Sequence, residues 1–170
     1  MNPMDLKAAI ESILFIADEP VEMDRLAEVL GIDRETVRAL VDELANEYSG
    51  RGIRLQRLGE KIQMVSAPET APYVEKFLEL KPSRRLSQAA LETLAIIAYL
   101  QPVTRAQIEA IRGVNSDGVL RSLLSKGLIE EVGHLDSPGR PALYGTTFQF
   151  LQYFGLERLE DLPPLEEKDA

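Results

Sequence analysis

Residues 108–133 read IEAIRGVNSDGVLRSLLSKGLIEEVG. The spacing of the apolar residues predicts a short helix that stops at Gly113, a tight turn, and a second amphipathic helix. Ser116 stands where an N-cap is expected, and Gly127 suits the end of the second helix because glycine adopts a positive φ without strain. A strand follows. This order is typical of a DNA-binding helix-turn-helix.

The rest of the second half completes a winged-helix order. A helix ends at the break made by Gln101 and Pro102, and Thr104-Arg-Ala-Gln107 forms a capping box for the next helix. The expected strands and the last helix lie at residues 128–134, 142–147 and 148–154.

The first half repeats this plan, with a third helix that Asp33 is expected to cap. Turn residues and inward apolar residues recur 82 positions later, as in Pro20 with Pro102, Gly31 with Gly113, and Val37 with Val119. Such matches are those that a shared fold requires.

The predicted fold class is therefore mainly α with small β-hairpins (α+β), as two tandem winged-helix domains. The domains are expected at residues 1–80 and 87–157, with a linker at residues 81–86 and an acidic, partly disordered tail at residues 158–170. Leu156, Leu159 and Leu162 are placed to dock back on the second domain.

Composition limits the chemistry. The 170 residues include no cysteine and a single histidine, His134, so thiolate metal sites and disulfides are excluded. No phosphate-binding glycine loop occurs, and the acids are spread along helical faces. We expect no enzyme activity, no cofactor and no metal. The longest apolar run, residues 94–100, is too short for a membrane span, and the N-terminus lacks the basic lead of a secretory signal. We expect a cytoplasmic protein with no membrane partner.

The charge distribution argues against DNA as the main partner. The chain carries a net charge of -9; residues 1–80 hold 9 Lys or Arg against 16 Asp or Glu, and residues 81–156 hold 8 against 6. The third helix of the first domain is acidic and would be repelled by phosphates. The second domain offers Arg121 on its third helix and Arg140 in its wing, so any DNA contact is expected to be weak or indirect. A DNA-binding transcriptional regulator remains the alternative interpretation.

Two helices carry more apolar residues than one buried face needs. Residues 94–100 read LAIIAYL, and residues 13–16 read ILFI. Each helix is either central to its own fold or covered in part by another chain. The second alternative predicts a homodimer, with Phe15 and Ile16 at the interface.

The sequence resembles the segregation and condensation protein B family. The residues that carry the resemblance start at Leu86 and read SQAALETLAIIAYLQPVTRAQIEAIRGVNSDGVLRSLLSKGLIEEVG, then PGRPALYGTT and FLQYFGLERLEDLP. The first half fits through its layout and its IESILF start. One departure is His134 after Gly133, where the family more often has arginine, which removes a cation from the wing.

The resemblance implies a non-catalytic subunit of the bacterial SMC–kleisin condensin complex, associated with the nucleoid. Such a subunit dimerises mainly through its N-terminal domain. It binds the middle of the kleisin, segregation and condensation protein A, and reaches the SMC ATPase through that kleisin. The resemblance thus implies a helix-turn-helix that serves as a protein-binding scaffold, which suits an acidic surface.

We expect the kleisin to contact the first helix and wing of the second domain, through the residues Tyr99, Gln101, Arg105, Asp117, Arg121 and Arg140. Structural alternatives exist for most of them. The alternative role of Tyr99 is that of a core residue, and the alternative role of Gln101 is to end a helix. Arg105 is alternatively a solvated side chain at the start of a helix, and Arg140 alternatively forms a local ion pair. The alternative role of Asp117 is to stabilise a helix N-terminus through the helix dipole.

Overall fold

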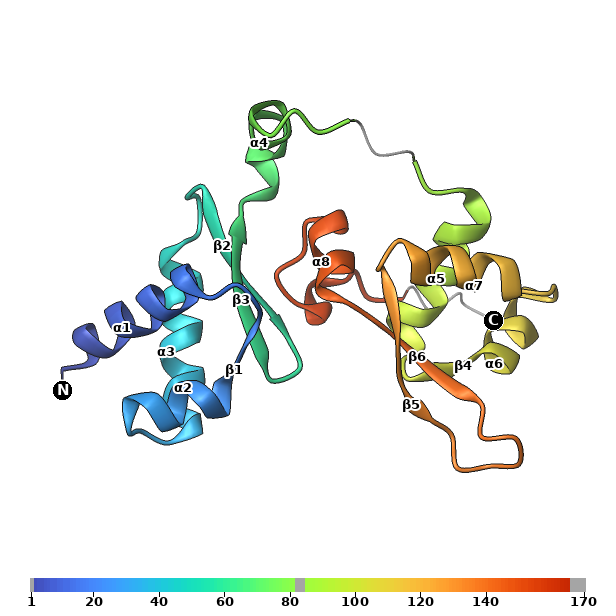
Figure 1. Cartoon of the computed structure of the whole chain (residues 1–170), viewed down its shortest axis with the longest axis horizontal. Coiled ribbons are helices and arrows are strands. Elements are labelled where there is room, and N and C mark those ends of the chain that lie inside the picture. Colours follow the sequence, from blue (N-terminus) through green and yellow to red (C-terminus); the bar gives the residue numbers. More distant parts are fainter. Residues whose placement is uncertain (1, 82–84, 166–170) are drawn as a thin grey trace. The chain divides into compact units, whose positions relative to one another are not determined.

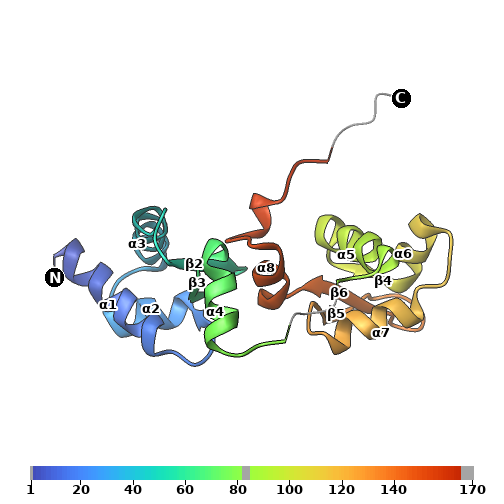
Figure 2. The same cartoon turned by 90° about the horizontal axis from the view of Figure 1, so that it is seen from above.

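The computed structural model describes residues 2–81 and 85–165. The chain forms two compact units, and the second unit, residues 82–154, is inserted between two segments of the first, residues 1–81 and 155–170. Each unit is a winged helix with its own apolar core. Figure 1 shows the order of the elements, and Figure 2 shows the same elements from above.

The first unit begins with three helices and a three-stranded sheet. Their bounds are α1 Pro3–Ile16, β1 Val21–Glu22, α2 Met23–Leu30, α3 Arg34–Glu47, β2 Ile53–Leu58 and β3 Lys61–Ser66. The 3-10 helix η1 Pro68–Thr70 and the helix α4 Ala71–Phe77 follow. The strand order is β1-β3-β2, with all pairs antiparallel, so β2 is an edge strand.

The core of this unit lies between the helices and one face of the sheet. On α1 the buried residues recur every fourth position, at Leu6, Ile10 and Leu14, which is the stripe that a helix presents to a core. The sheet contributes Leu55 and the fully buried Ile62. Figures 1 and 2 both show α1, α2 and α3 on one side of the β2–β3 ribbon.

The second unit repeats the arrangement. Its elements are α5 Gln88–Leu100, β4 Val103–Thr104, α6 Arg105–Arg112, α7 Asp117–Ser125, β5 Ile129–His134, β6 Ala142–Thr146 and α8 Phe148–Phe154. The strand order β4-β6-β5 matches that of the first unit. Leu94 and Ile97 of α5 are buried with Ile108 of α6 and Leu123 of α7. Leu94, Ile97 and Ala98 of the apolar stretch on α5 are therefore core, whereas Ala95 and Leu100 are exposed.

The predicted fold class is confirmed: the chain contains two winged-helix units, mainly helical with small antiparallel sheets. The sequence did not predict β1 and β4, because two-residue strands carry no alternation pattern. Part of the expected linker, residues 82–84, and the end of the tail, residues 166–170, lie outside the described residues.

The C-terminal segment differs from the expectation. Residues from Gly155 onward group with the first unit, whereas we expected the second domain to extend to residue 157 and its leucines to dock there. The physical reason is polar: backbone carbonyls of Leu156 and Glu157 accept hydrogen bonds from Gln56 Nε2 and Arg57 N, at 2.9 and 2.8 Å. A 3-10 helix, η2 Leu159–Asp161, follows.

The helix caps test the local predictions. Asp33 caps α3 by accepting hydrogen bonds from Thr36 N at 2.8 Å and Thr36 Oγ1 at 2.6 Å. Thr104 and Gln107 form the predicted capping box. The predicted side-chain cap by Ser116 is wrong, because its buried hydroxyl accepts a hydrogen bond from Arg112 Nη1 at 2.9 Å instead.

We expect Asp33→Ala to lower the melting temperature of the first unit by about 5 °C, because the first-turn amides of α3 lose their acceptor. The hydrogen bonds from Thr36 hold the pKa of Asp33 below its ordinary value of 3.8. Its contribution is therefore fully present above pH 3.8 and is lost as the pH falls through the lowered pKa. Thermal unfolding followed by circular dichroism at pH 7 and at pH 2.5 measures both effects. The control is Asp18→Ala, an exposed loop acid; an equal loss in both variants would contradict the capping role.

Candidate partner-binding surfaces

The outward face of α3 in the first unit, which would enter a DNA groove, has its cations paired with acids. Arg34 forms ion pairs with Asp24 at 3.4 Å and with Glu60, and Arg38 Nη2 lies 3.2 Å from Glu60 Oε1. Hydrogen bonding from Arg34 lowers the pKa of Glu60. The guanidinium groups that could grip phosphate are thus neutralised within the unit, and this face is poorly suited to DNA.

The first unit also exposes an apolar surface at the end of α1. Phe15 and Ile16 are 76% and 74% exposed, while their neighbour Leu14 is buried in the core. Ala8 and Ser12, small exposed residues, lie on the same helix within one or two turns. Two adjacent large apolar side chains at this exposure are what a helix presents when another chain covers it. Phe15 and Ile16 are therefore not core residues of the first unit.

Three of the six predicted contact residues meet in one exposed cluster on the second unit. Asp117, the first residue of α7, lies between two guanidinium groups: Arg121 Nη2 is 2.7 Å from Oδ2, and Arg105 Nη1 is 3.2 Å from Oδ1. The Arg121 side chain is 79% exposed. Exposed ion pairs of this kind contribute little to stability, so breaking them to form ion pairs with another molecule costs little free energy. We call Arg105, Asp117 and Arg121 the α6–α7 cluster.

Sequence reasoning missed Tyr144, a half-buried residue of β6 that lies near this cluster. Burial raises the pKa of the Tyr144 hydroxyl, the nearby Glu131 raises it further, and the charges of Arg105 and Asp117 also act on it. Register pairs Tyr144 with Glu131 on one side and Val103 on the other. The only sequence signal was its place in PGRPALYGTT, where nothing distinguishes it from a core aromatic.

Gln101 holds the end of α5 to β6. Its Oε1 accepts a hydrogen bond from Thr146 N at 2.9 Å, and its Nε2 donates to Thr146 Oγ1 and to the carbonyl of Ala98, both at 3.0 Å. The side chain passes over Gly145, where an added Cβ would lie 3.0 Å from Gln101 Oε1 and 3.0 Å from Val132 Cγ1. The glycine therefore makes room for this clamp, and the Gln101 amide is used inside the unit.

The two remaining predicted contact residues, Tyr99 and Arg140, lie on different elements of the second unit. Tyr99 is half-buried near the end of α5, beside the 48% exposed Leu100. Arg140 is exposed at the tip of the wing between β5 and β6 and adopts a positive φ of 40°. Its amide donates to the carbonyl of Ser137 at 2.9 Å, which holds the tip in a tight turn.

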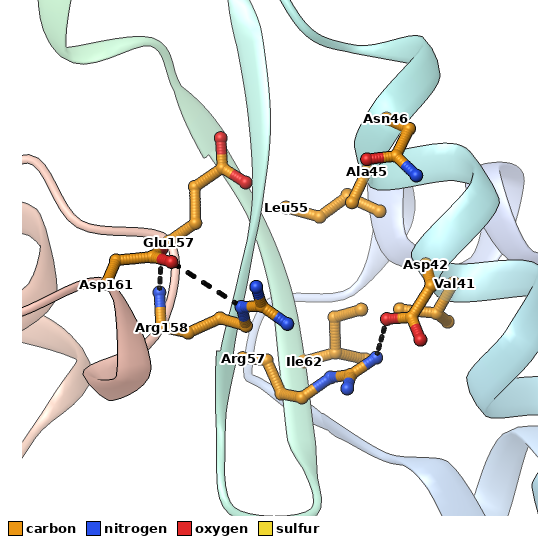
Figure 3. Close-up of a pocket in the computed structure, with 10 residues that line it drawn as sticks. All are labelled: Val41, Asp42, Ala45, Asn46, Leu55, Arg57, Ile62, Glu157, Arg158 and Asp161. Carbon is orange, nitrogen blue, oxygen red and sulfur yellow. Dashed lines mark hydrogen bonds and ion pairs between the residues drawn. The ribbon is translucent and has the colours of Figure 1, made fainter.

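A pocket of about 250 Å³ opens on the first unit between α3, β2 and the C-terminal segment. Figure 3 shows Val41, Ala45, Leu55 and Ile62 on its apolar side and charged residues around them. The charges are paired: Arg57 Nη2 lies 2.6 Å from Asp42 Oδ1, and Arg158 Nε lies 3.7 Å from Asp161 Oδ1 (Figure 3). The third acid of the lining, Glu157, pairs with Arg54, which lies outside the lining, so the lining itself holds three acids against two arginines.

Two further observations concern the described residues only. Within residues 2–81 and 85–165, no group of three His, Asp or Glu side chains is arranged to hold a metal ion. No helix in the same ranges is long and apolar enough to cross a membrane. His134 is exposed at the end of β5.

Comparison with known proteins gives a consistent family. Residues 8–165 match the family model described as segregation and condensation complex subunit ScpB. A segregation and condensation protein B from Clostridium botulinum is 48% identical over 163 residues, which cover 95% of this chain and 84% of the relative.

Two solved structures are similar to this chain in sequence. ScpB from Mycobacterium tuberculosis is 42% identical, with 92% of this chain and 98% of that chain covered and a TM-score of 0.45. A dimer of a ScpB N-terminal domain complexed with ScpA peptide is 31% identical, with 44% of this chain and 95% of that chain covered and a TM-score of 0.41.

We expect Gln101→Ala to destabilise the second unit by about 1–3 kcal/mol, because the buried Thr146 amide loses its acceptor. Urea unfolding followed by circular dichroism measures the change. Gln88→Ala, at an exposed position at the start of α5, is the matched control and is expected to change stability by less than about 0.5 kcal/mol. A Gln101 variant as stable as the Gln88 variant would show that the clamp is dispensable.

Proposed function

Because the chain belongs to the segregation and condensation protein B family, we propose that it is a non-catalytic subunit of a bacterial SMC–kleisin condensin complex. In this role it binds the central region of the kleisin as a homodimer and supports chromosome condensation and segregation at the nucleoid. ATP hydrolysis belongs to the SMC partner, which this chain reaches through the kleisin. The observation that carries the proposal is the family match, which extends over residues 8–165 and therefore includes both winged-helix units.

The surface proposed for dimerisation is the exposed end of α1. Phe15 and Ile16 offer adjacent apolar side chains that are not part of the core, on the unit with an excess of acids. A two-fold axis places the same patch of both copies in contact, so the interface contains Phe15 and Ile16 of each copy. Aromatic residues at the centre of such patches carry much of the binding free energy.

The surface proposed for the kleisin is the α6–α7 cluster with Tyr144 and the wing tip at Arg140. The cluster is polar and exposed, and its ion pairs are of the kind that a partner can replace at small cost. Tyr144 supplies a half-buried aromatic ring beside it. Tyr99 belongs to the same proposal, whereas Gln101 acts by positioning the end of α5 against β6.

Electrostatics suits a protein partner better than a nucleic acid. Residues 1–80 carry a net charge of -7, from 9 Lys or Arg and 16 Asp or Glu, and the α3 cations are paired inside the unit. Acids at the rim of an interface steer a basic segment toward it and repel DNA. Any DNA contact is proposed to be weak or to come through the other subunits.

We expect Phe15→Asp to raise the dimer dissociation constant by at least about thirtyfold, because a buried aromatic anchor becomes an unpaired charge. Sedimentation equilibrium gives the mass, and circular dichroism shows that the variant stays folded. Val29→Asp, at a 55% exposed apolar position on α2, is the matched control and should leave the mass unchanged. A folded Phe15 variant with the wild-type mass would move the dimer surface away from α1.

We expect Arg121→Glu to weaken binding of the purified central segment of the kleisin by about tenfold or more, because the guanidinium proposed as the contact is lost and the new carboxylate repels Asp117. Titration calorimetry at fixed salt measures the dissociation constant. Arg25→Glu reverses a similarly exposed cation of a local ion pair on the first unit and is expected to bind like wild type.

The two possible failures are distinct. Unchanged binding of a folded Arg121→Glu variant would exclude the α6–α7 cluster as the contact surface while leaving the function intact. No binding of the kleisin segment by the wild-type chain, at concentrations where the chain is folded, would overturn the proposed function itself.

A further inference from the structure

The outer face of β2 buries two polar side chains. Residues Arg54 and Gln56 alternate with the core residue Leu55 and therefore point to the opposite face of the sheet. They are only 9% and 2% exposed. Burial of a guanidinium and an amide is costly unless each finds a partner, so the outer face of this strand is built to receive something polar.

Part of this need is met beside the strand. Arg54 Nη1 donates to the carbonyl of Tyr48 at 2.9 Å, and Arg54 Nη2 lies 3.4 Å from Glu69 Oε1. Gln56 Oε1 accepts a hydrogen bond from Gln63 Nε2 at 2.9 Å.

The C-terminal segment of the same chain supplies the remaining partners. Gln56 Nε2 donates to the carbonyl of Leu156 at 2.9 Å, and Arg54 Nε lies 3.3 Å from Glu157 Oε1. The backbone amide of Arg57, at the free edge of the sheet, donates to the carbonyl of Glu157 at 2.8 Å. We call residues 155–161 the strap.

The two ends of the strap are shaped for this position. Gly155 adopts a φ of +66°, and an added Cβ would lie 3.1 Å from Pro68 Cβ, so a larger residue would strain the backbone and press on η1. At the other end, Asp161 Oδ2 accepts a hydrogen bond from Arg158 N at 3.1 Å and closes η2. Figure 3 shows Glu157, Arg158 and Asp161 on the side of β2 away from α3.

The contact is specific but shallow. No residue of the strap is fully buried, and its leucines Leu156 and Leu159 are half-buried. A pocket of about 250 Å³ remains between the strap, β2 and α3. Desolvation raises the pKa of Glu157 despite the opposing effect of Arg54, so docking also carries a cost for the strap. A segment held by a few polar bonds over an incompletely filled surface belongs to the low-stability part of a structure.

Docking of the strap also affects how the second unit is attached to the first. Because residues 82–154 form the second unit, the strap begins at the residue that follows that unit. While the strap is docked, both ends of the second unit are attached to the first. Seven residues that come free span at most roughly 24 Å when extended.

We propose that the strap is a releasable latch that restricts the motion of the second unit. Docked on Arg54, Gln56 and the edge of β2, it attaches the C-terminal end of that unit to the first winged helix. Released, it leaves the second unit attached through the connection after α4 alone and uncovers the β2 edge. This latch does not depend on which other protein the chain binds.

The chain contains no cysteine, so pairs of spin labels can be placed without removing native residues. One pair, Ala39→Cys with Glu160→Cys, reports on docking of the strap, since both positions are exposed and Glu160 lines a hollow with Arg38 and Glu60. A second pair, Glu19→Cys with Lys126→Cys, has one label in each unit and reports on their relative motion. Distance distributions come from double electron–electron resonance on the full chain.

Two variants release the strap from its own side, so that the fold of β2 is not disturbed. Glu157→Lys replaces the ion pair to Arg54 with repulsion between two cations, and we expect the population of long strap distances to rise at least roughly fivefold. Gly155→Ala adds the clash with Pro68 and the strain of the positive φ. In both variants the distribution for the second pair should broaden.

Each control repeats the type of substitution made in one strap variant, at a position outside the strap. Glu28→Lys makes the same reversal in an exposed ion pair with Arg25, and Gly139→Ala places alanine at a φ of +83° with no atom within 4 Å of its Cβ. Neither is expected to change either distribution. The proposal is overturned if both strap variants keep the wild-type strap distance, and equally if the strap opens while the distances between the two units stay as narrow as in wild type.

Discussion

The fold depends on one constraint: each small unit must bury a single apolar core between three short helices and a narrow sheet. In the first unit Ile10, Val37 and Ile62 are fully buried where helix and sheet meet, and in the second unit Ile97 and Ile108 occupy the comparable centre. Cores this small leave little stability in reserve. Caps such as Asp33, and the clamp from Gln101 to Thr146, therefore matter because they satisfy polar groups at the edges of these cores.

Pairing of charges within each unit explains how a helix-turn-helix can be suited to binding proteins instead of DNA. On α3 the cations that would face phosphates are held by acids from the same unit, with Glu60 receiving both Arg34 and Arg38. At α7, Asp117 separates two arginines, and Glu109 Oε1 also lies 3.7 Å from Arg105 Nε. Charges that are balanced locally give a face with fixed polar geometry and little net field, which favours recognition of a particular protein surface over the general attraction of a polyanion.

Three surfaces then have different physical characters. The end of α1 is apolar and exposed, which suits a permanent contact with a second copy. The α6–α7 cluster is polar and exposed, which suits an exchangeable contact with a partner. The strap on β2 is polar and half-buried, which suits a contact within the chain that opens and closes.

The sequence by itself determined the local structure and the order of the elements. The period of the apolar residues, the cap at Asp33 and the box at Thr104 are set by neighbours within a few positions, and the repeat made the two winged helices visible. Only the tertiary structure decided which apolar excess was core, because Leu14 and Phe15 have the same local pattern and opposite exposure. It also decided that Ser116 serves Arg112 rather than a helix end, and that the segment after Gly155 belongs to the first unit. These outcomes depend on hydrogen bonds between residues such as Gln56 and Leu156, which are 100 positions apart and which no local pattern can encode.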